Sequence, residues 1–170
     1  YGYSIGQPKF DKMREKISGA FDVFRDIHSL SDIEALKIIN NDKIDIAVDL
    51  TGYTNFSRTS LFSFRPAPVQ INYLGYPGTL GANFIDYIIS DQNLIPKGFQ
   101  KFYTEMPIYL PHTYWPTDDT CIISQKVQTK EDMKLPGDGF VFCCFNNNYK
   151  ISPTEFDIWM RLMAKVEGRV

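Results

Sequence analysis

The sequence lacks any long hydrophobic run. No stretch approaches the roughly 20 consecutive apolar residues that a membrane-spanning helix needs, and residues 1–4 carry neither the basic nor the apolar region of a signal peptide. We therefore expect a cytoplasmic protein with no membrane partner. The 18 basic residues are balanced by 20 acidic ones, which leaves no broad positive field for nucleic acid, so we expect no nucleic-acid partner.

Metal-ligating side chains are also scarce. His28 and His112 are the only histidines, they lie far apart, and neither has a cysteine or carboxylate at ligand spacing. The number of cysteines is odd, and the adjacent Cys143 and Cys144 would point to opposite faces of a strand, which suits thiols better than disulfides. The sequence thus predicts chemistry with no metal and no cofactor.

Apolar side chains, in contrast, are plentiful. Of the 170 residues, 44% are hydrophobic and 15% aromatic, which is enough to bury a sizeable core in one ordinary domain. The chain opens at Tyr1 without Met and stops at Val170, close to the end of a helical pattern. We expect it to be a segment of a longer protein.

Apolar periodicity and capping signals predict alternating helices and strands. One helix starts at Pro8 and carries an apolar stripe at spacings of three and four, formed by Phe10, Met13, Ile17, Phe21 and Phe24. A second helix starts at a capping box of Ser31 and Glu34 and ends near Asn41. Shorter helices are predicted over residues 58–64 and 97–103, and strands over residues 44–50, 69–74, 84–90 and 107–110. Because such strands are joined by crossovers, the pattern predicts a parallel, doubly wound α/β sheet with ligands beyond the C-terminal strand ends.

The composition changes in the last third of the chain. Residues 116–138 are rich in polar residues and poor in aromatic ones, as in an interdomain linker or a crossing loop. After them, residues 140–145 form an apolar run of strand length, and a helix starts near Pro153. We predict an N-terminal lobe over residues 1–115, a linker over residues 116–138, and the start of a second lobe over residues 139–170.

Two loops hold candidate binding residues. The first, Leu74 to Gly81, follows a strand and contains three glycines and a proline, so its backbone amides could approach a ligand. An ordinary turn that needs positive φ explains the same composition. In the second, Asn146 to Asn148 and Lys150 could bind a diphosphate. Alternatively, the asparagines cap the following helix and Lys150 is a solvated charge.

Two single residues at strand ends also leave alternatives open. His112 could act as a base or hydrogen-bond a sugar, or it could be a packed loop histidine. Asp49 could accept a ribose or sugar hydroxyl, or it could cap its own loop.

Three passages together resemble the catalytic region of O-GlcNAc transferases, especially the bacterial relatives that carry tetratricopeptide repeats upstream. They are Asp45 to Thr54, Arg65 to Thr79, and Cys143 to Ile151, in this order and spacing. The resemblance implies a GT-B architecture of two Rossmann-like lobes, of which this chain holds most of the first and the opening strand and helix of the second. It also implies transfer of a sugar from UDP-GlcNAc to Ser or Thr of acceptor proteins, with inversion and without a metal.

The resemblance also implies roles for individual residues. It matches Leu74, Gly75 and Pro77 to the loop beside the sugar, Lys150 to the lysine that neutralises the diphosphate, and Asn147 to a nucleotide contact. Asn147 departs from the family, because animal members have glutamine there. The histidine usually proposed as the general base lies upstream of this segment, and the main uridine contacts lie downstream. We therefore predict that the segment alone has no transferase activity.

Two other functions compete with this one. A plant-type branch of the family moves fucose from GDP-fucose, but it tends to lack the glycine and the histidine found here at Gly78 and His112. A degenerate transferase fold could instead hold a protein partner without catalysis. A pure scaffold has no need for a cation at a phosphate site, so Lys150 favours an enzyme over it.

Overall fold

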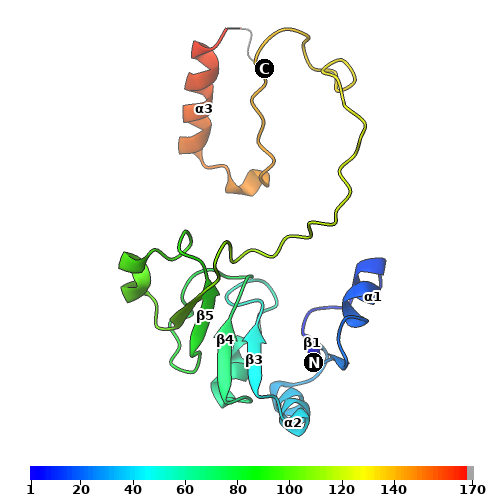
Figure 1. Cartoon of the computed structure of the whole chain (residues 1–170), viewed down its shortest axis with the longest axis vertical. Helices are drawn as coiled ribbons and strands as arrows, with labels where there is room; N and C mark the ends of the chain where they lie inside the picture. The colour runs from blue at the N-terminus through cyan, green and yellow to red at the C-terminus, as the bar shows by residue number, and fades with distance from the viewer. Residues whose placement is uncertain (168–170) are drawn as a thin grey trace. The chain divides into compact units, whose positions relative to one another are not determined.

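The computed structural model describes residues 1–167 and divides into two compact units, Tyr1–Thr117 and Asp118–Val170 (Figure 1). Each unit is described by itself. Within the described range, no helix is long and apolar enough to cross a membrane. The lobe and linker boundaries drawn from the sequence stay predictions.

The first unit is built on parallel strands, as the sequence predicts. A four-stranded sheet has the order β3-β4-β5-β6, with strands at Ile46–Asp49, Val69–Asn72, Tyr87–Ser90 and Met106–Tyr109. A separate two-stranded parallel sheet pairs β1 (Gly2–Ser4) with β2 (Phe24–Asp26). The predicted α/β class with a Rossmann-like parallel sheet is confirmed.

The helix predicted at Ser31 is present as α2 (Asp32–Asp42). The backbone N–H of Glu34 donates to the Ser31 hydroxyl oxygen (3.3 Å), and the Glu34 carboxylate accepts from the Ser31 N–H (2.9 Å), so both halves of the capping box form. The two shorter predicted helices are 3-10 helices, η1 (Thr59–Phe64) and η2 (Lys97–Phe102). Pro66 stands just after the first of them, and proline at this place opposes a longer helix.

The long N-terminal helix predicted from Pro8 is wrong. Only α1 (Lys12–Ser18) is helical: Asp11 caps its start by accepting from the Arg14 N–H (2.9 Å), and it ends before Gly19. Phe24 belongs to β2, where it pairs with Gly2. The Phe21 ring lies so close to Gly2 that a Cβ there would be 2.8 Å from it. The aromatic residues at helical spacing therefore include ones that pack around a short strand pair.

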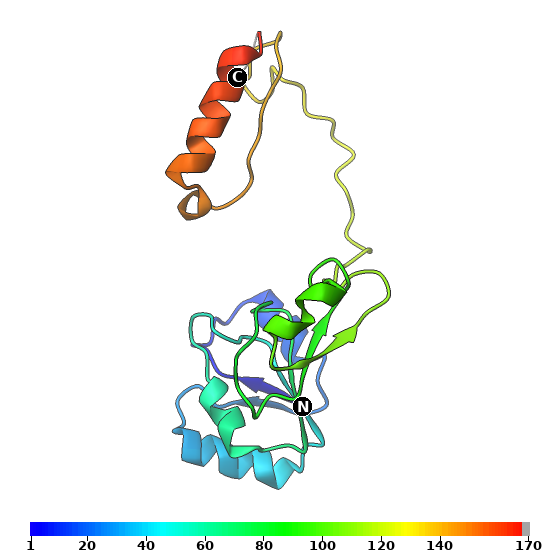
Figure 2. The same ribbon diagram turned by 90° about the vertical axis from the view of Figure 1, so that its left-hand side faces the viewer.

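A hydrophobic cluster joins α2 to the segments on either side of it. Its buried members come from the chain before α2, from α2 itself and from η1, and they are Ile27, Ala35, Leu36, Ile39 and Leu61. Figure 2, in which α2 is seen lengthwise, shows η1 beside it. Arg58 links the segment before α2 to the start of α2, because its guanidinium donates to the Ile27 carbonyl (2.8 Å) and to the Asp32 carboxylate (2.5 Å).

The two faces of the four-stranded sheet differ in chemistry. The strand register puts alternate residues on opposite faces. One face carries only apolar and aromatic side chains, namely Ile46, Val48, Val69, Ile71, Tyr87, Ile89, Met106 and Ile108. Four of these, Ile46, Val48, Met106 and Ile108, are exposed. The other face buries polar side chains, among them Gln70 within β4 and, at strand ends, Asp49, Asn72 and Ser90. Side-chain hydrogen bonding is thus concentrated on the second face of the sheet.

The second unit has few regular elements. It contains η3 (Asn148–Lys150) and α3 (Pro153–Lys165), which starts where the sequence predicts a helix. Ser152 stands at the N-cap position of this helix, and its N–H and hydroxyl both donate to the Glu155 carboxylate, as in a capping box. The alternative in which the asparagines cap it is wrong. The predicted strand over residues 140–145 is not formed within the described range, because a strand needs a neighbour with which to pair.

Candidate functional site

The loops that follow β3 and β4 touch each other at the C-terminal edge of the sheet. A Cβ on Gly75 would lie 2.2 Å from the Leu50 carbonyl oxygen, so only glycine fits between the two backbones. Gly52 has φ of +54°, and a Cβ on it would lie 2.5 Å from the Tyr76 Cβ. The glycines thus allow two loops to pack as one surface, at the edge where ligands bind in parallel sheets.

The first turn of the β4 loop is strained. Leu74 has φ of +70°, and the Gly75 N–H donates to the Tyr73 carbonyl oxygen (2.9 Å). A positive φ together with a hydrogen bond that spans two residues is the arrangement of the rare γ-turn. Such a conformation costs on the order of 1–3 kcal/mol for a residue other than glycine and persists only where neighbouring contacts enforce it. The positions of Leu74 and Gly75 therefore depend on what holds the rest of the loop.

Asn72 holds the middle of this loop. Its side chain is fully buried at the end of β4, and its amide nitrogen donates to the carbonyl oxygens of Tyr76 (3.1 Å) and Gly78 (3.2 Å). Its amide oxygen has no hydrogen-bond partner among the described residues. Two backbone carbonyls that would otherwise be free to turn are fixed by one side chain.

Tyrosine hydroxyls fix the outer part of the loop. Tyr103 donates to the Pro77 carbonyl oxygen (3.1 Å), and burial raises the pKa of the Tyr103 phenol above its ordinary value, so the phenol keeps its proton. Tyr53, from the β3 loop, donates to the Leu80 carbonyl oxygen (2.6 Å). Its ring meets the Tyr76 ring edge to face, with 5.5 Å between centroids. Tyr103, which precedes β6, thus fixes Pro77. Tyr53, in the loop after β3, fixes Leu80 at the end of the β4 loop.

Asp49 caps its own loop. Its buried carboxylate accepts from the Thr51 N–H (2.9 Å), the Thr51 hydroxyl (2.7 Å), the Gly52 N–H (3.0 Å) and the Thr59 hydroxyl (2.9 Å). These bonds occupy both carboxylate oxygens. The loop-capping alternative for Asp49 is therefore the one that the structure supports.

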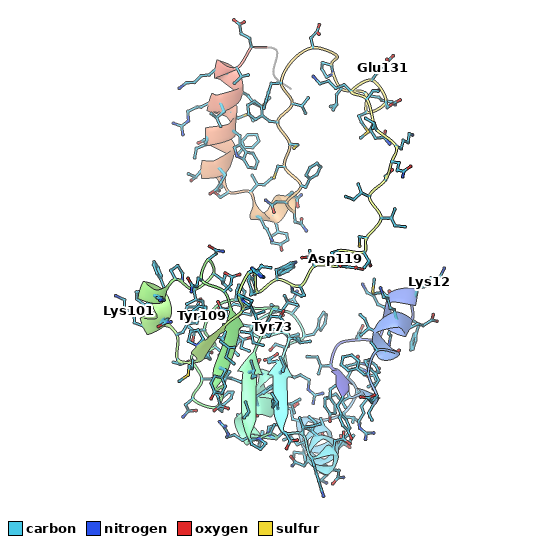
Figure 3. All side chains as sticks on the ribbon, in the orientation of Figure 1. Lys12, Tyr73, Lys101, Tyr109, Asp119 and Glu131 are labelled. Carbon is cyan, nitrogen blue, oxygen red and sulfur yellow. The ribbon has the colours of Figure 1, made fainter. Side chains whose placement is uncertain are left out.

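A buried carboxylate also joins the loops after β5 and β6. The Asp91 carboxylate accepts from the backbone N–H groups of Asn93, Leu94 and Tyr114, each at 2.8 Å. These bonds hold the pKa of Asp91 below its ordinary value, the bond from Leu94 having the largest effect. Tyr73, labelled in Figure 3, donates to the Tyr114 carbonyl oxygen (2.8 Å). The carboxyl ends of the sheet strands are thus joined by hydrogen bonds.

The predicted site residues are divided between the two units. Leu74, Gly75 and Pro77 lie within one loop of the first unit, and Gly75 and Pro77 are exposed. Asn147 and Lys150 lie in the second unit, where both are exposed and the Lys150 N–H donates to the Asn147 carbonyl oxygen (3.0 Å). The Lys150 ammonium makes no ion pair within residues 1–167.

His112 is exposed, so the alternative of a packed loop histidine is wrong. In the part of the chain that the structure describes, no group of three or more His, Cys, Asp or Glu side chains could hold a metal ion.

Sequence reasoning missed the residues that shape the loop. Asn72 and Glu105 are polar, buried and without a recognisable motif, and their hydrogen bonds to the loop join residues that are 4 to 26 positions apart in the sequence. One weak signal was present, since Gln70 and Asn72 alternate as polar residues in a strand whose neighbours are apolar. A polar side chain on a buried strand needs a partner and therefore marks a loop that folds back over it.

Comparison with known proteins gives matches over the whole chain. The chain matches glycosyl transferase family 41 over residues 1–125 and 117–170. It is 34% identical over 169 residues to the probable UDP-N-acetylglucosamine--peptide N-acetylglucosaminyltransferase SEC of Arabidopsis thaliana, covering 96% of this chain and 17% of that protein. It is 32% identical over 143 residues to the corresponding transferase of Caenorhabditis elegans, covering 78% of this chain and 12% of that one.

A solved structure agrees with these matches. A lysine-to-methionine mutant of the O-GlcNAc transferase of Thermobaculum terrenum superposes with a TM-score of 0.81 and 32% sequence identity, over 98% of this chain and 31% of that one. The chain thus spans less than a third of that structure and about a sixth of the plant relative, 17%. On sequence and structure together, the chain belongs to glycosyl transferase family 41.

Proposed function

We propose that the protein carrying this chain transfers N-acetylglucosamine from UDP-GlcNAc to Ser or Thr hydroxyl groups of other proteins. The observation that carries the proposal is the match to family 41 along the whole chain, with relatives named as peptide N-acetylglucosaminyltransferases. Because the chain spans 17% of the plant relative, it supplies one part of such an enzyme.

The part that this chain supplies to the donor site is a rigid backbone surface. In our proposal, Leu74, Gly75 and Pro77 lie beside the sugar of the donor. The close approach at Gly75 and the hydrogen bonds to the Pro77 and Tyr76 carbonyls support this role, because they fix the loop before a ligand binds. A preformed surface loses little conformational entropy on binding.

Lys150 and Asn147 supply the second part. We assign Lys150 to the diphosphate and Asn147 to the nucleotide, and this is supported by the exposure of both residues and by the bond from the Lys150 N–H to the Asn147 carbonyl oxygen, which keeps them close together. One lysine about 4 Å from a phosphate oxygen contributes roughly 4 kcal/mol of gross attraction at an effective dielectric near 20. If this attraction acts only in the transition state, it accelerates the reaction by at most about a thousandfold. A lysine can thus take over part of a metal ion's role, and we propose a reaction without a metal.

The reaction is a displacement at the anomeric carbon. The acceptor hydroxyl oxygen attacks this carbon from the face opposite the diphosphate, so the new bond forms with inversion as the bond to UDP breaks. The hydroxyl proton passes to a base that this chain does not supply. The negative charge that develops on the leaving UDP is stabilised by Lys150. Tetratricopeptide repeats upstream and a cytoplasmic location stay predictions.

The two competing functions fare differently. The relatives cited here are named for N-acetylglucosamine, so a GDP-fucose donor receives no support from them. A non-catalytic protein-binding module stays open to experiment, because a degenerate transferase keeps its fold. Nucleotide binding distinguishes such a module from the proposed transferase, since a scaffold has no reason to bind UDP.

The experiment is isothermal titration of UDP, UDP-GlcNAc and GDP-fucose into the full-length protein with a chelator present. We expect binding of UDP and UDP-GlcNAc that Lys150→Ala weakens by tenfold or more, on the order of one charge-assisted contact. Lys165→Ala, in the last turn of α3, is the control and should leave the affinity unchanged. Absence of binding to every nucleotide would favour the non-catalytic module.

A further inference from the structure

A buried carboxylate lies beneath the β4 loop and has no cation beside it. Glu105 precedes β6 directly and is only 2% exposed. No lysine, arginine or histidine within residues 1–167 forms an ion pair with it. A buried charge without an opposite charge is unfavourable unless hydrogen bonds replace its lost water. The groups that donate to Glu105 therefore explain why it is tolerated there.

Two of these donors belong to the end of the β4 loop. The Leu80 N–H donates to Glu105 Oε1 (2.7 Å), and the Thr79 hydroxyl donates to Glu105 Oε2 (2.6 Å). The Thr104 hydroxyl is a third and longer donor to Oε2 (3.2 Å). Hydrogen bonds to a carboxylate are about twice as strong as bonds between neutral groups. Glu105 thus anchors the loop end at two consecutive residues.

The direction of the bond from Thr79 follows from its other contacts. The Thr79 Oγ1 accepts from the Gly81 N–H (3.0 Å) and from the Thr104 N–H (3.3 Å). With both acceptor positions taken, the hydroxyl has its single proton left to donate, and Glu105 Oε2 is the nearest acceptor. The arrangement needs both a carboxylate at 105 and a hydroxyl at 79.

The loop is therefore held at its middle by Asn72 and at its end by Glu105. Leu74 lies between β4 and these anchors. Its φ of +70° is strained, so the residue would leave this conformation if the loop were not fixed. Glu105 reaches neither Leu74 nor Gly75 itself, so any effect on a ligand passes through Thr79 and Leu80. This makes Glu105 a positioning residue and not a catalytic one.

We propose that Glu105, acting through the Thr79 hydroxyl and the Leu80 N–H, sets the conformation of the Leu74–Pro77 backbone that recognises the sugar of the donor. The inference rests on the proposed function, because it concerns the same donor site. It predicts that losing the anchor weakens binding of the sugar and leaves binding of the nucleotide alone unchanged. The discriminating quantity is therefore the ratio of the Kd for UDP-GlcNAc to the Kd for UDP.

The test is titration of both nucleotides into the full-length protein and its variants. Glu105→Gln keeps the shape of the side chain, but its amide can accept only at one of the two anchor points, so we expect the Kd ratio to rise about tenfold. Thr79→Val keeps the shape and loses the hydroxyl, and we expect the same rise. Thr79→Ser restores the hydroxyl and should restore most of the ratio. Glu131→Gln, at an exposed glutamate labelled in Figure 3, is the control for a lost charge.

The outcomes separate this inference from the function on which it rests. Unchanged ratios in Glu105→Gln and Thr79→Val would overturn the positioning role while leaving the transferase proposal intact. Equal weakening of UDP and UDP-GlcNAc would also overturn it, because general loss of folding has that effect. If Glu105→Gln fails to fold, the pair Thr79→Val and Thr79→Ser decides the matter. A wild-type protein that binds no UDP would overturn both proposals.

Discussion

The two units contain similar apolar side chains, but only the first buries them. Ile88 in β5 is 1% exposed, whereas Phe145 in the second unit is 97% exposed. Every residue that the structure shows as buried lies between Gly2 and Glu105, and none lies among the described residues after 117. Hydrophobic composition alone therefore does not produce a core, because apolar residues also need a neighbouring element to cover them.

The difference follows from the range of the interactions. In the first unit, each sheet strand pairs with a partner that is 15 or more residues away in the sequence, and α2 packs against η1. In the second unit, α3 is specified by Ser152, Pro153 and Glu155, all within its first turn. A helix can form from local signals, whereas a strand requires a second strand.

Removing a core side chain should show the largest contrast. We expect Ile88→Ala to lower the free energy of unfolding by about 2–5 kcal/mol, because the lost apolar contacts leave a cavity in the sheet. Phe145→Ala removes a larger side chain and should change it by less than about 0.5 kcal/mol. Urea unfolding of the chain, followed by circular dichroism, measures both. A large loss in Phe145→Ala would mean that the second unit buries this ring in solution.

Close approach of two backbones gives the next contrast. Gly75→Ala places a Cβ 2.2 Å from the Leu50 carbonyl oxygen, and we expect about 1–3 kcal/mol of destabilisation from this overlap. Gly137→Ala is the matched control in the second unit, since nothing lies within 4 Å of a Cβ there. The same urea titration applies. Equal stability of the two variants would contradict the contact between the β3 and β4 loops.

The site illustrates how much the sequence alone could predict. The sequence predicts α2 from a capping box, the start of α3 from Pro153, and the four strands of the sheet from short apolar runs, because these signals are local. The glycine-rich loop at Leu74 was identified from its composition. Its anchors Asn72 and Glu105 were not, because their partners are backbone groups brought close only by the folded sheet. The strands β1 and β2 were missed for a related reason, as three residues are too few to show a period.

Acid should affect the first unit through Asp91. Backbone hydrogen bonds hold the pKa of Asp91 below its ordinary value of 3.8, so its contribution to stability is present above pH 4 and is lost as the pH falls through the folded-state pKa. Asp91→Asn should therefore flatten the fall of the urea midpoint between pH 5 and about pH 2. Asp119→Asn, at an exposed residue of the second unit, is the control. Identical pH profiles for Asp91→Asn and the wild type would contradict this assignment.

The smallest effect compares two copies of one local motif. Ser31 and Glu34 cap α2 in the first unit, and Ser152 and Glu155 cap α3 in the second, in the same pattern of serine followed three residues later by glutamate. Loss of such a cap costs a helix about 1 kcal/mol. Because α2 is part of a buried cluster, Ser31→Ala should lower the urea midpoint of the whole first unit.

Ser152→Ala should act differently, because no residue of α3 is buried. We expect a lower helical signal at 222 nm with no change in the urea midpoint, since melting of α3 exposes little that is not already exposed. Both variants remove a serine hydroxyl from the same sequence motif, and the two helices differ in burial, because α2 has three buried residues and α3 has none. A lower midpoint in Ser152→Ala would mean that α3 stabilises the first unit, and the contrast between the two units would then be smaller than burial alone indicates.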